Sequence, residues 1–338
     1  MKVSIIIPVY NVAPYIERCI KSVMNQTFQD IECILVNDAS SDDCITIAER
    51  LIADYNGPIR FKIFNHEHNR GVAAARNTGI DAATGDYICF VDSDDEITTD
   101  CIEKLSRPIL NNPAIEMVAG CYVTIRKDEN NIISEQPFSC PQIELTTKTA
   151  VRDFFFSRQH ENRYIINKLV NRAFVLNNRI YFKERVVAED FLWYFFYNKY
   201  LSHLFIIPDI TYKYIKRPNS ITTTKNKHYR NDLGFYFAEI ANNLEPSDGV
   251  REVSLYLKRF SLFYLEGPST PVYKQVSDQF LKVLKNHHCF KEWLFLKSIV
   301  LVSRFSILRK LIWKIGVFLA LSALPFLKNI KNNDENNI

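Results

Sequence analysis

Two aspartates separated by a single residue are the first candidates for chemistry in this sequence. Asp92 and Asp94 follow residues 87–91, an apolar run with the composition of a buried strand. Side chains at positions i and i+2 of an extended chain point to the same side, so the two carboxylates can share one divalent cation. Hard oxygen ligands suit Mg²⁺ or Mn²⁺, which in turn bind a diphosphate. The alternative is a solvated turn, because aspartate is also a common turn residue.

The elements that must position these carboxylates alternate between strand and helix over the first hundred residues. The predicted strands are the short apolar runs 3–8, 31–36, 61–64 and 87–91. Amphipathic segments lie between them, the first of which follows Asn11, where we expect a helix N-cap. Continuous apolar strands separated by amphipathic helices predict a parallel sheet with both faces covered.

Polar side chains follow each of these predicted strands at the point where the strand ends. They are Tyr10 with Asn11, Asn37 with Asp38, residues 65–69 and residues 92–95. Ligands of open parallel sheets bind beyond the carboxyl ends of the strands, so these groups are expected to converge on one site.

The remainder of the chain has a different pattern. We predict one long strand or a strand pair at 115–126 and further strands at 203–207 and 211–216. Helices are predicted at 147–156, 171–178 and 191–200. Beyond about residue 225 the pattern is helical. The length of 338 residues is typical of two domains, and the hydrophobic fraction of 47% is typical of a folded protein.

At these spacings the sequence resembles a known family. The matching segments are SIIIPVYN at 4–11, NQT at 25–27 with 31–38, NRG at 69–71, ARN at 75–77, GDY at 85–87 and FVDSDD at 90–95. Together they resemble the family 2 glycosyltransferases, inverting enzymes of the GT-A fold, over about the first 220 residues. The resemblance implies an α/β fold with a Rossmann-like, mostly parallel sheet and flanking helices.

The resemblance implies roles for the nucleotide-binding residues. Pro8, Tyr10 and Asp38 match positions that hold the base, where a tyrosine ring can stack and a carboxylate can accept an N–H bond. Arg76 matches a position near the donor diphosphate, and a guanidinium suits phosphate oxygens. The alternatives are a core or rim aromatic for Tyr10 and a helix-surface ion pair for Arg76.

The resemblance also assigns the metal ligands and the catalytic base. Asp94 matches the direct metal ligand, and Asp92 matches the residue near the ribose and the metal. The family carries its base as the aspartate of a Glu-Asp pair that opens a helix, which Glu189 and Asp190 fit. One carboxylate then takes a proton from the attacking hydroxyl. Otherwise the pair only favours the N-terminus of the helix electrostatically.

Two further segments resemble parts of the family. Asn167-Lys168-Leu169 resembles a segment leading into the acceptor region, although Ile166 replaces the usual aromatic before it. The basic stretch 217–222 begins with Arg217 and is a candidate contact to the donor phosphates or to the acceptor. The alternative for that stretch is a surface turn. We expect His66 in a surface loop.

The C-terminal tail combines apolar and basic residues. Seven cations and no acid lie between residues 293 and 333, and residues 315–327 are an uncharged run that is apolar apart from Ser322. A bilayer span needs about 20 apolar residues, so we expect a helix that lies on an anionic membrane surface. The alternatives are a core helix of a C-terminal bundle, a dimer contact and a true span. Outside the tail there is no basic excess that would indicate a nucleic-acid partner.

These features predict three regions along the chain. Residues 1–225 form the GT-A domain, with a nucleotide-sugar half at 1–100 and an acceptor half at 101–225. A helical extension with the amphipathic tail covers 226–330, and 331–338 are disordered. The eight cysteines include no C-x-x-C pair, and the first apolar run is too short for a signal peptide. We therefore expect free thiols in a cytoplasmic protein at the inner face of the cell membrane.

The predicted reaction is the inverting, metal-dependent transfer of one sugar from a UDP-sugar to a hydroxyl. The expected acceptor is a glycan or a polyprenyl-linked glycan in the synthesis of a surface polysaccharide, with Mn²⁺ or Mg²⁺ as cofactor. One alternative is an inactive scaffold that binds nucleotide sugars. The other is a nucleotidyltransferase, which usually has a glycine-rich loop after its first strand, whereas residues 8–12 contain no glycine.

Overall fold

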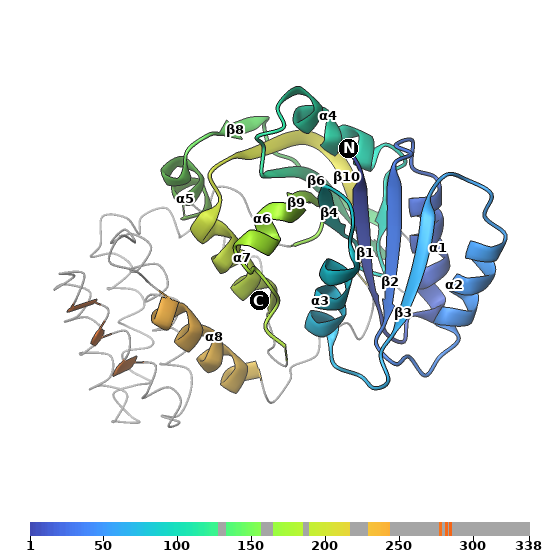
Figure 1. Cartoon of the computed structure of the whole chain (residues 1–338), viewed down its shortest axis with the longest axis horizontal. Helices are drawn as coiled ribbons and strands as arrows, with labels where there is room; N and C mark the ends of the chain where they lie inside the picture. The colour runs from blue at the N-terminus through green and yellow to red at the C-terminus, as the bar shows by residue number, and fades with distance from the viewer. Residues whose placement is uncertain are drawn as a thin grey trace. The chain divides into compact units, whose positions relative to one another are not determined.

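The computed structural model describes residues 1–127, 133–156, 165–184, 189–216 and 229–243, with short pieces at 277–278, 281–282 and 284–285. The chain forms two compact units, Met1–Asn226 and Lys227–Ile338. All of the described strands belong to the first unit, which Figure 1 shows as a sheet flanked by helices.

Four parallel strands form the N-terminal half of the sheet. They are β1 (Val3–Val9), β2 (Ile31–Asn37), β3 (Arg60–Asn65) and β4 (Tyr87–Phe90), in the spatial order β3-β2-β1-β4. The register places Val3 opposite both Ile31 and Tyr87, so the carboxyl ends of the three central strands lie at one edge. The predicted strands and their parallel arrangement are confirmed.

The helices of this half lie on both faces of the sheet. α1 (Ala13–Met24) and α2 (Cys44–Ala53) connect strands on one side of β1, while α3 (Val72–Ala82) returns the chain to β4 on the other side. Right-handed crossovers that run in opposite directions along a sheet place their helices on opposite faces. Figure 1 shows this arrangement, with α3 across the sheet from α1 and α2.

The second half of the sheet mixes parallel and antiparallel pairs. Its path from β4 is β9 (Lys168–Asn171), β6 (Met117–Lys127), β10 (Leu204–Lys216) and β5 (Glu96–Ile97). β9 is antiparallel to both of its neighbours, and β6 and β10 are parallel. β7 (Ile133–Phe138) pairs with β6, and β8 (Ile143–Leu145) pairs with β10. The predicted, mostly parallel arrangement of strands is thus found in the N-terminal half of the sheet.

One long strand replaces the two that we predicted at 203–207 and 211–216. β10 runs continuously from Leu204 to Lys216, with register shifts against β6 between Ile206 and Ile210 and between Ile210 and Tyr212. Pro208 lies within the first shift and lacks a backbone N–H, so an irregularity there accommodates it. Pro208 interrupts the apolar pattern of the sequence, but the strand continues through it.

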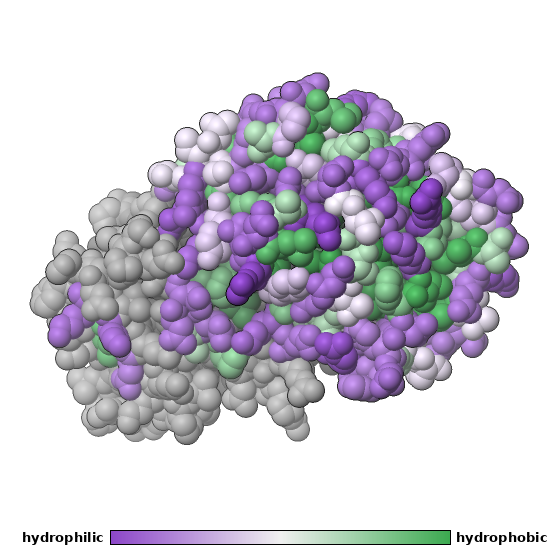
Figure 2. All heavy atoms as spheres, viewed as in Figure 1, coloured by the Kyte–Doolittle hydropathy of each residue, from purple (hydrophilic) through white to green (hydrophobic). Residues whose placement is uncertain are grey.

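Most of the remaining helices follow the sequence pattern closely, but the helix at 101–111 was not predicted. α4 (Cys101–Asn111), α5 (Lys148–Phe156), α6 (Arg172–Asn177) and α7 (Glu189–Tyr200) belong to the first unit, and α8 (Tyr229–Asn243) belongs to the second. No helix in the described ranges is long and apolar enough to cross a membrane. The amphipathic tail and the end at 331–338 lie outside the described residues. Figure 2 shows polar residues over much of the visible face of the first unit, with smaller apolar areas between them.

The turns after β1 and β2 differ from the predicted helix cap. Val12 is the N-cap of α1, and the Asn11 side chain instead accepts the backbone N–H of Ser41 at 2.8 Å. Asn11 has a φ of 51°, in the left-handed region that asparagine tolerates. The predicted cap is wrong, because this side chain joins the two turns that follow β1 and β2.

Ala39, in the turn after β2, has a φ of 59°, although it has a Cβ atom. Ala39→Gly removes a left-handed penalty of about 1–2 kcal/mol, which the extra chain entropy of glycine offsets by about 0.5–1 kcal/mol. We expect the free energy of unfolding in urea to rise by about 0.5–1 kcal/mol. The control Ala48→Gly, inside α2, should lower it by about 1 kcal/mol or more. A loss of stability in Ala39→Gly would contradict this interpretation.

Candidate active site

The polar groups that follow β1, β2 and β4 lie at one edge of the sheet, as predicted. Pro8 is within β1 opposite Val36, and Tyr10 follows with 49% of its surface exposed. The backbone N–H of Asp38 donates to the carbonyl of Val9 at 2.9 Å, which holds the ends of the two strands together. The Tyr10 ring is therefore at the rim and not in the core.

Asp38 is buried and organises the loop that precedes α3. One carboxylate oxygen accepts the N–H of Arg70 at 2.9 Å and Nδ1 of His66 at 2.7 Å, and the other accepts the N–H of Gly71 at 2.7 Å. These donors stabilise a buried charge. Each oxygen can accept more than one bond, so the protein contacts leave some acceptor capacity.

Arg76 joins three carboxylates from separate parts of the chain. One terminal nitrogen lies 3.0 Å from Glu189 and 2.6 Å from Asp190, and the other lies 3.0 Å from Asp92. The arginine belongs to α3, Asp92 follows β4, and the other two residues open α7. The side chain of Arg76 is 4% exposed, while those of Asp92 and Asp190 are 30% and 29% exposed. Arg76 is thus buried, and it bridges two carboxylates, Asp92 and Asp190, that are partly exposed to solvent.

The charges in this cluster change one another's pKa. Burial by itself would lower the pKa of Arg76, but Asp190, Asp92 and Glu189 outweigh burial and raise it. Burial, followed by the charge of Asp190, raises the pKa of Glu189 to about 7. Burial also raises the pKa of Asp190, against the opposing effect of Arg76. Carboxylates with raised pKa values bind protons more readily than ordinary carboxylates, as a general base requires.

A stack of aromatic rings holds α7 against the sheet beneath this cluster. Trp193 lies between Phe182 and Tyr197, with centroid distances of 5.4 and 4.9 Å and nearly parallel planes. The guanidinium of Arg76 lies over the Phe182 ring, 5.3 Å from its centroid. Phe90, in β4, packs edge-on against both Phe182 and Trp193. The aromatic residues of α7 therefore fix the end of the helix that carries Glu189 and Asp190.

The turn that carries Asp92 and Asp94 is held by Asp95, for which the sequence pattern indicated no separate role. Asp95 is fully buried, and its carboxylate accepts the hydroxyl of Tyr212 and the N–H of Ile215, each at 2.8 Å. The same hydroxyl accepts the N–H of Asp92 at 3.2 Å. Burial, with the charges of Asp92 and Asp94, raises the pKa of Asp95 well above its usual value. Asp95 and Tyr212 thus anchor the turn to β10.

The carboxylates of Asp92 and Asp94 fit a metal that also binds phosphate. Both residues are partly exposed, and they follow the same strand end. No cluster of three or more potential ligands occurs among the described residues. Mg²⁺ is commonly held by one or two carboxylates with substrate phosphates and water completing the shell, so two aspartates are sufficient. The donor set is appropriate for Mg²⁺ or Mn²⁺ together with a diphosphate.

Of the two basic residues predicted to contact the phosphates or the acceptor, the structure describes Lys168 but not Arg217. Lys168 is 1% exposed, its Nζ lies 3.3 Å from the carbonyl of Ile166, and it is 6.0 Å from the centroid of the Tyr194 ring. Burial lowers the pKa of Lys168 to about 7, which Asp190 opposes. This interior position does not favour direct contact with a phosphate in solution. Arg217 lies outside the described residues.

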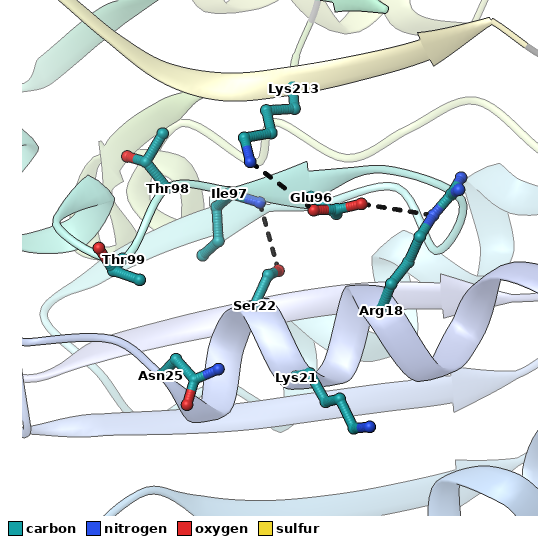
Figure 3. A pocket seen from close by; sticks show the side chains of 9 residues that line it. All are labelled: Arg18, Lys21, Ser22, Asn25, Glu96, Ile97, Thr98, Thr99 and Lys213. Carbon is teal, nitrogen blue, oxygen red and sulfur yellow. Dashed lines mark hydrogen bonds and ion pairs between the residues drawn. The ribbon is translucent and has the colours of Figure 1, made fainter. Parts of the chain in front are cut away.

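A cavity of about 390 Å³, lined mainly by polar and charged residues, lies between α1 and β5 (Figure 3). Glu96 is at its centre, 3.6 Å from Arg18 and 3.9 Å from Lys213. Arg18 also donates to the carbonyl of Asp94 at 2.7 Å. Arg18 and Lys213 are thus engaged with Glu96, Arg18 also holds the turn, and the third cation of the lining, Lys21, pairs with Glu17 at 2.6 Å. None of the clustered carboxylates at Arg76 lines the cavity.

His66 contributes more than its predicted loop position suggested. It does follow β3, but its side chain is 7% exposed and bridges Asp38 and Thr78, the latter at 2.9 Å from Nε2. No spacing of residues in the sequence indicates this contact. The only signal was that a polar residue follows a strand whose carboxyl end lies at the site.

Solved structures share the fold of this chain. The structure of S. aureus TarS 1-349 in complex with UDP-GlcNAc aligns with a TM-score of 0.58 and 20% identity, over 88% of this chain and 89% of that one. The shared fold is that of the GT-A glycosyltransferases. A family model described as Glycosyl transferase family 2 matches residues 4–183.

Relatives with curated names support the same class. EpsJ of Bacillus subtilis, an uncharacterized glycosyltransferase, is 33% identical over 251 residues, which cover 69% of each chain. The GalNAc(5)-diNAcBac-PP-undecaprenol beta-1,3-glucosyltransferase of Campylobacter jejuni is 27% identical over 297 residues, 87% of each chain. The chain belongs to family 2 of the glycosyltransferases, and the fold and enzyme class expected from the sequence are confirmed.

Removal of the Arg76 charge should destabilise the protein in a pH-dependent way. In Arg76→Met three carboxylates lose their cation, and we expect a loss of about 3 kcal/mol or more at pH 8. The pKa values of Glu189 and Asp190 are already raised, so these groups take up protons as the pH falls. The deficit should therefore shrink between pH 8 and pH 5, as measured by urea unfolding.

Two further variants make this test specific. Arg76→Lys keeps the charge but not the forked geometry, and we expect an intermediate loss of about 1–2 kcal/mol. Arg50→Met removes an exposed arginine from α2 and should change stability by less than about 0.5 kcal/mol. A deficit in Arg76→Met that is equal at both pH values would show that repulsion among the carboxylates is not its cause.

Proposed function

We propose that the protein transfers one sugar from a UDP-sugar to a hydroxyl of a glycan or a polyprenyl-linked glycan, with inversion and with a divalent metal. The observation that carries this proposal is the Arg76 bridge. The guanidinium of Arg76 contacts both Asp92, which follows β4, and Asp190, at the start of α7. A donor diphosphate and an acceptor hydroxyl that contact these two residues would meet at the same place.

The nucleotide would bind at the ends of β1 and β2. The exposed Tyr10 ring offers a stacking surface, and Asp38 lies at the same strand ends with some acceptor capacity for a base N–H. Pro8 shapes the strand before Tyr10. The UDP-GlcNAc complex of TarS supports UDP as the nucleotide, since the two chains share the fold.

The diphosphate would lie beside the aspartate turn. Asp94, with Asp92, would hold Mg²⁺ or Mn²⁺, which when bound supplies positive charge that stabilises the departing diphosphate. The backbone of the turn is fixed by Asp95 and Tyr212, so the carboxylates are oriented before the donor arrives. Arg76 adds a fixed positive charge on the same side, in contact with Asp92.

The base of the reaction would be Asp190. Its carboxylate would take the proton of the acceptor hydroxyl as that oxygen bonds to the anomeric carbon, while the bond from this carbon to the diphosphate oxygen breaks on the opposite face. This displacement inverts the anomeric configuration. Glu189 would keep Arg76 in place through its 3.0 Å contact. The positive charge of Arg76 would then be shared between the two carboxylates and not directed at Asp190 only.

A lipid-linked acceptor would bring the reaction to a membrane surface. The Campylobacter jejuni relative bears the name of an enzyme that acts on an undecaprenol-linked glycan, which supports an acceptor of this kind. The basic, apolar tail would bind the anionic inner face of the cell membrane. Arg217 remains a proposed contact for the acceptor or the phosphates, whereas the burial of Lys168 does not favour this role. The setting would be the synthesis of a surface polysaccharide.

Asp190→Asn removes the proposed base and keeps the size of the side chain. We expect turnover of a UDP-sugar to fall by about 100-fold or more, because proton transfer loses its acceptor. UDP binding in calorimetry should remain within about threefold of the wild type, since in the proposed arrangement the nucleotide would not contact this residue. Asp54→Asn, an exposed change after α2, is the matched control and should keep full activity. Full activity of Asp190→Asn would assign the base elsewhere.

Asp94→Ala tests the metal and the alternative of an inactive scaffold. We expect wild-type protein to bind UDP more tightly with Mn²⁺ than without it, and the variant to lose this difference. Calorimetry with UDP, GDP and CDP, each with and without Mn²⁺, measures both effects. Metal dependence that persists in Asp94→Ala would refute the assignment of the aspartate pair. Metal-dependent UDP binding without turnover on any acceptor would favour the scaffold.

A further inference from the structure

Two cysteines that the proposed reaction does not use are in contact within the acceptor half. Cys121, in β6, and Cys140, between β7 and β8, have Sγ atoms 2.7 Å apart. Both residues are buried, with 0% and 7% of their surface exposed. The S–S bond of a disulfide is about 2.05 Å long, so the sulfur atoms need to approach by less than about 1 Å to form one.

The pairing of β6 with β7 brings the two residues together. These strands are antiparallel, with Tyr122 opposite Phe138, and the rings of that pair stack at a centroid distance of 5.0 Å. Cys121 directly precedes Tyr122, and Cys140 follows Phe138 by two residues. Both sulfur atoms also lie near the carbonyl of Ile207 in β10, at 3.6 and 3.9 Å. Strand register, and not a sequence motif, creates this pair.

The surroundings of Cys121 favour its thiolate. The thiol and the backbone N–H of Cys140 lower the pKa of Cys121 against the effect of burial, and that N–H lies 3.2 Å from the Cys121 sulfur. Burial raises the pKa of cysteines elsewhere in the described chain: Cys19, Cys33, Cys44, Cys89 and Cys101. Cys121 therefore has the strongest thiolate character among the described cysteines.

We propose that Cys121 and Cys140 are a modification site, a dithiol that a hydroperoxide converts into an intrachain disulfide. The Cys121 thiolate attacks one peroxide oxygen, the O–O bond breaks, and hydroxide leaves, so that Cys121 becomes a sulfenic acid. The Cys140 sulfur then attacks the Cys121 sulfur and displaces the oxygen, which leaves as water with the Cys140 proton. Two thiols and one H₂O₂ give one disulfide and two waters.

The disulfide would fix a part of the acceptor half. The carbonyl of Cys121 accepts the Nδ2 of Asn167 at 2.8 Å, and Asn167 directly precedes Lys168 at the start of β9. A bond to Cys140 would therefore link the segment that enters β8 to the strands β6 and β9 at the centre of this half. Closing this loop should raise the thermal unfolding midpoint by about 5 °C.

The test uses the full chain in its reduced, folded state. The protein is treated with a small excess of H₂O₂, quenched, denatured, alkylated and digested for mass spectrometry. We expect a linked peptide that joins Cys121 to Cys140, a loss of two of the eight free thiols, and the higher thermal midpoint. Dithiothreitol should reverse all three changes.

Two variants separate the pair from the other cysteines. Cys44→Ser removes a buried cysteine of α2 and should leave the linked peptide unchanged. Cys140→Ser should abolish the linked peptide and leave a sulfenic acid at Cys121 that dimedone traps. If Cys140→Ser does not fold, the presence or absence of the linked Cys121–Cys140 peptide in the oxidised wild type tests the proposal. Retention of both thiols while methionines oxidise, or equal amounts of linked peptides from all cysteines, would overturn the proposal.

Discussion

The bridge formed by Arg76 is the interaction on which the candidate site depends. Three carboxylates converge at the end of the sheet, and without a cation they would repel one another. The guanidinium suits this position because its planar, forked donors can face several carboxylates at once. It also fixes the relative position of α7 and the end of β4, the elements that carry the proposed base and the proposed metal ligands.

The bridge relies in turn on packing below it. The stacked rings of Phe182, Trp193 and Tyr197 bury one face of α7, and Arg76 lies over the first ring of this stack. On the other side of Asp92, the buried Asp95 and the hydroxyl of Tyr212 hold the turn. The exposed carboxylates are therefore positioned by buried groups that have no direct part in the proposed chemistry. Such support keeps a site in its productive geometry before substrate binds.

The contacts of Arg76 in the structure differ from those that the family resemblance implies. The family resemblance places this residue near the donor diphosphate, whereas its terminal nitrogens here contact protein carboxylates. The two roles are compatible, since Asp92 belongs to the turn that would hold the metal and the phosphates. The helix-surface ion pair considered as the alternative does not describe this buried residue.

The sequence alone determined the N-terminal half of the fold and the edge of the sheet where the site lies. Apolar runs such as residues 3–8 and 31–36 indicate buried parallel strands, because period and composition are local properties that burial on both faces requires. Asp92 and Asp94 could be proposed from the pattern because they follow a predicted strand, whereas the Glu189-Asp190 pair was proposed from the family resemblance. The proline in β10 shows the limit of local patterns, since pairing with β6 kept the strand continuous.

Only the tertiary structure decided which of these groups meet. Arg76 and Asp190 are 114 positions apart, and Asp95 and Tyr212 are 117 apart, so no spacing rule could connect them. The burial of Lys168 and the contact of Cys121 with Cys140 follow from strand order and register in the mixed half of the sheet. These features depend on non-local pairing, which side-chain periodicity does not encode.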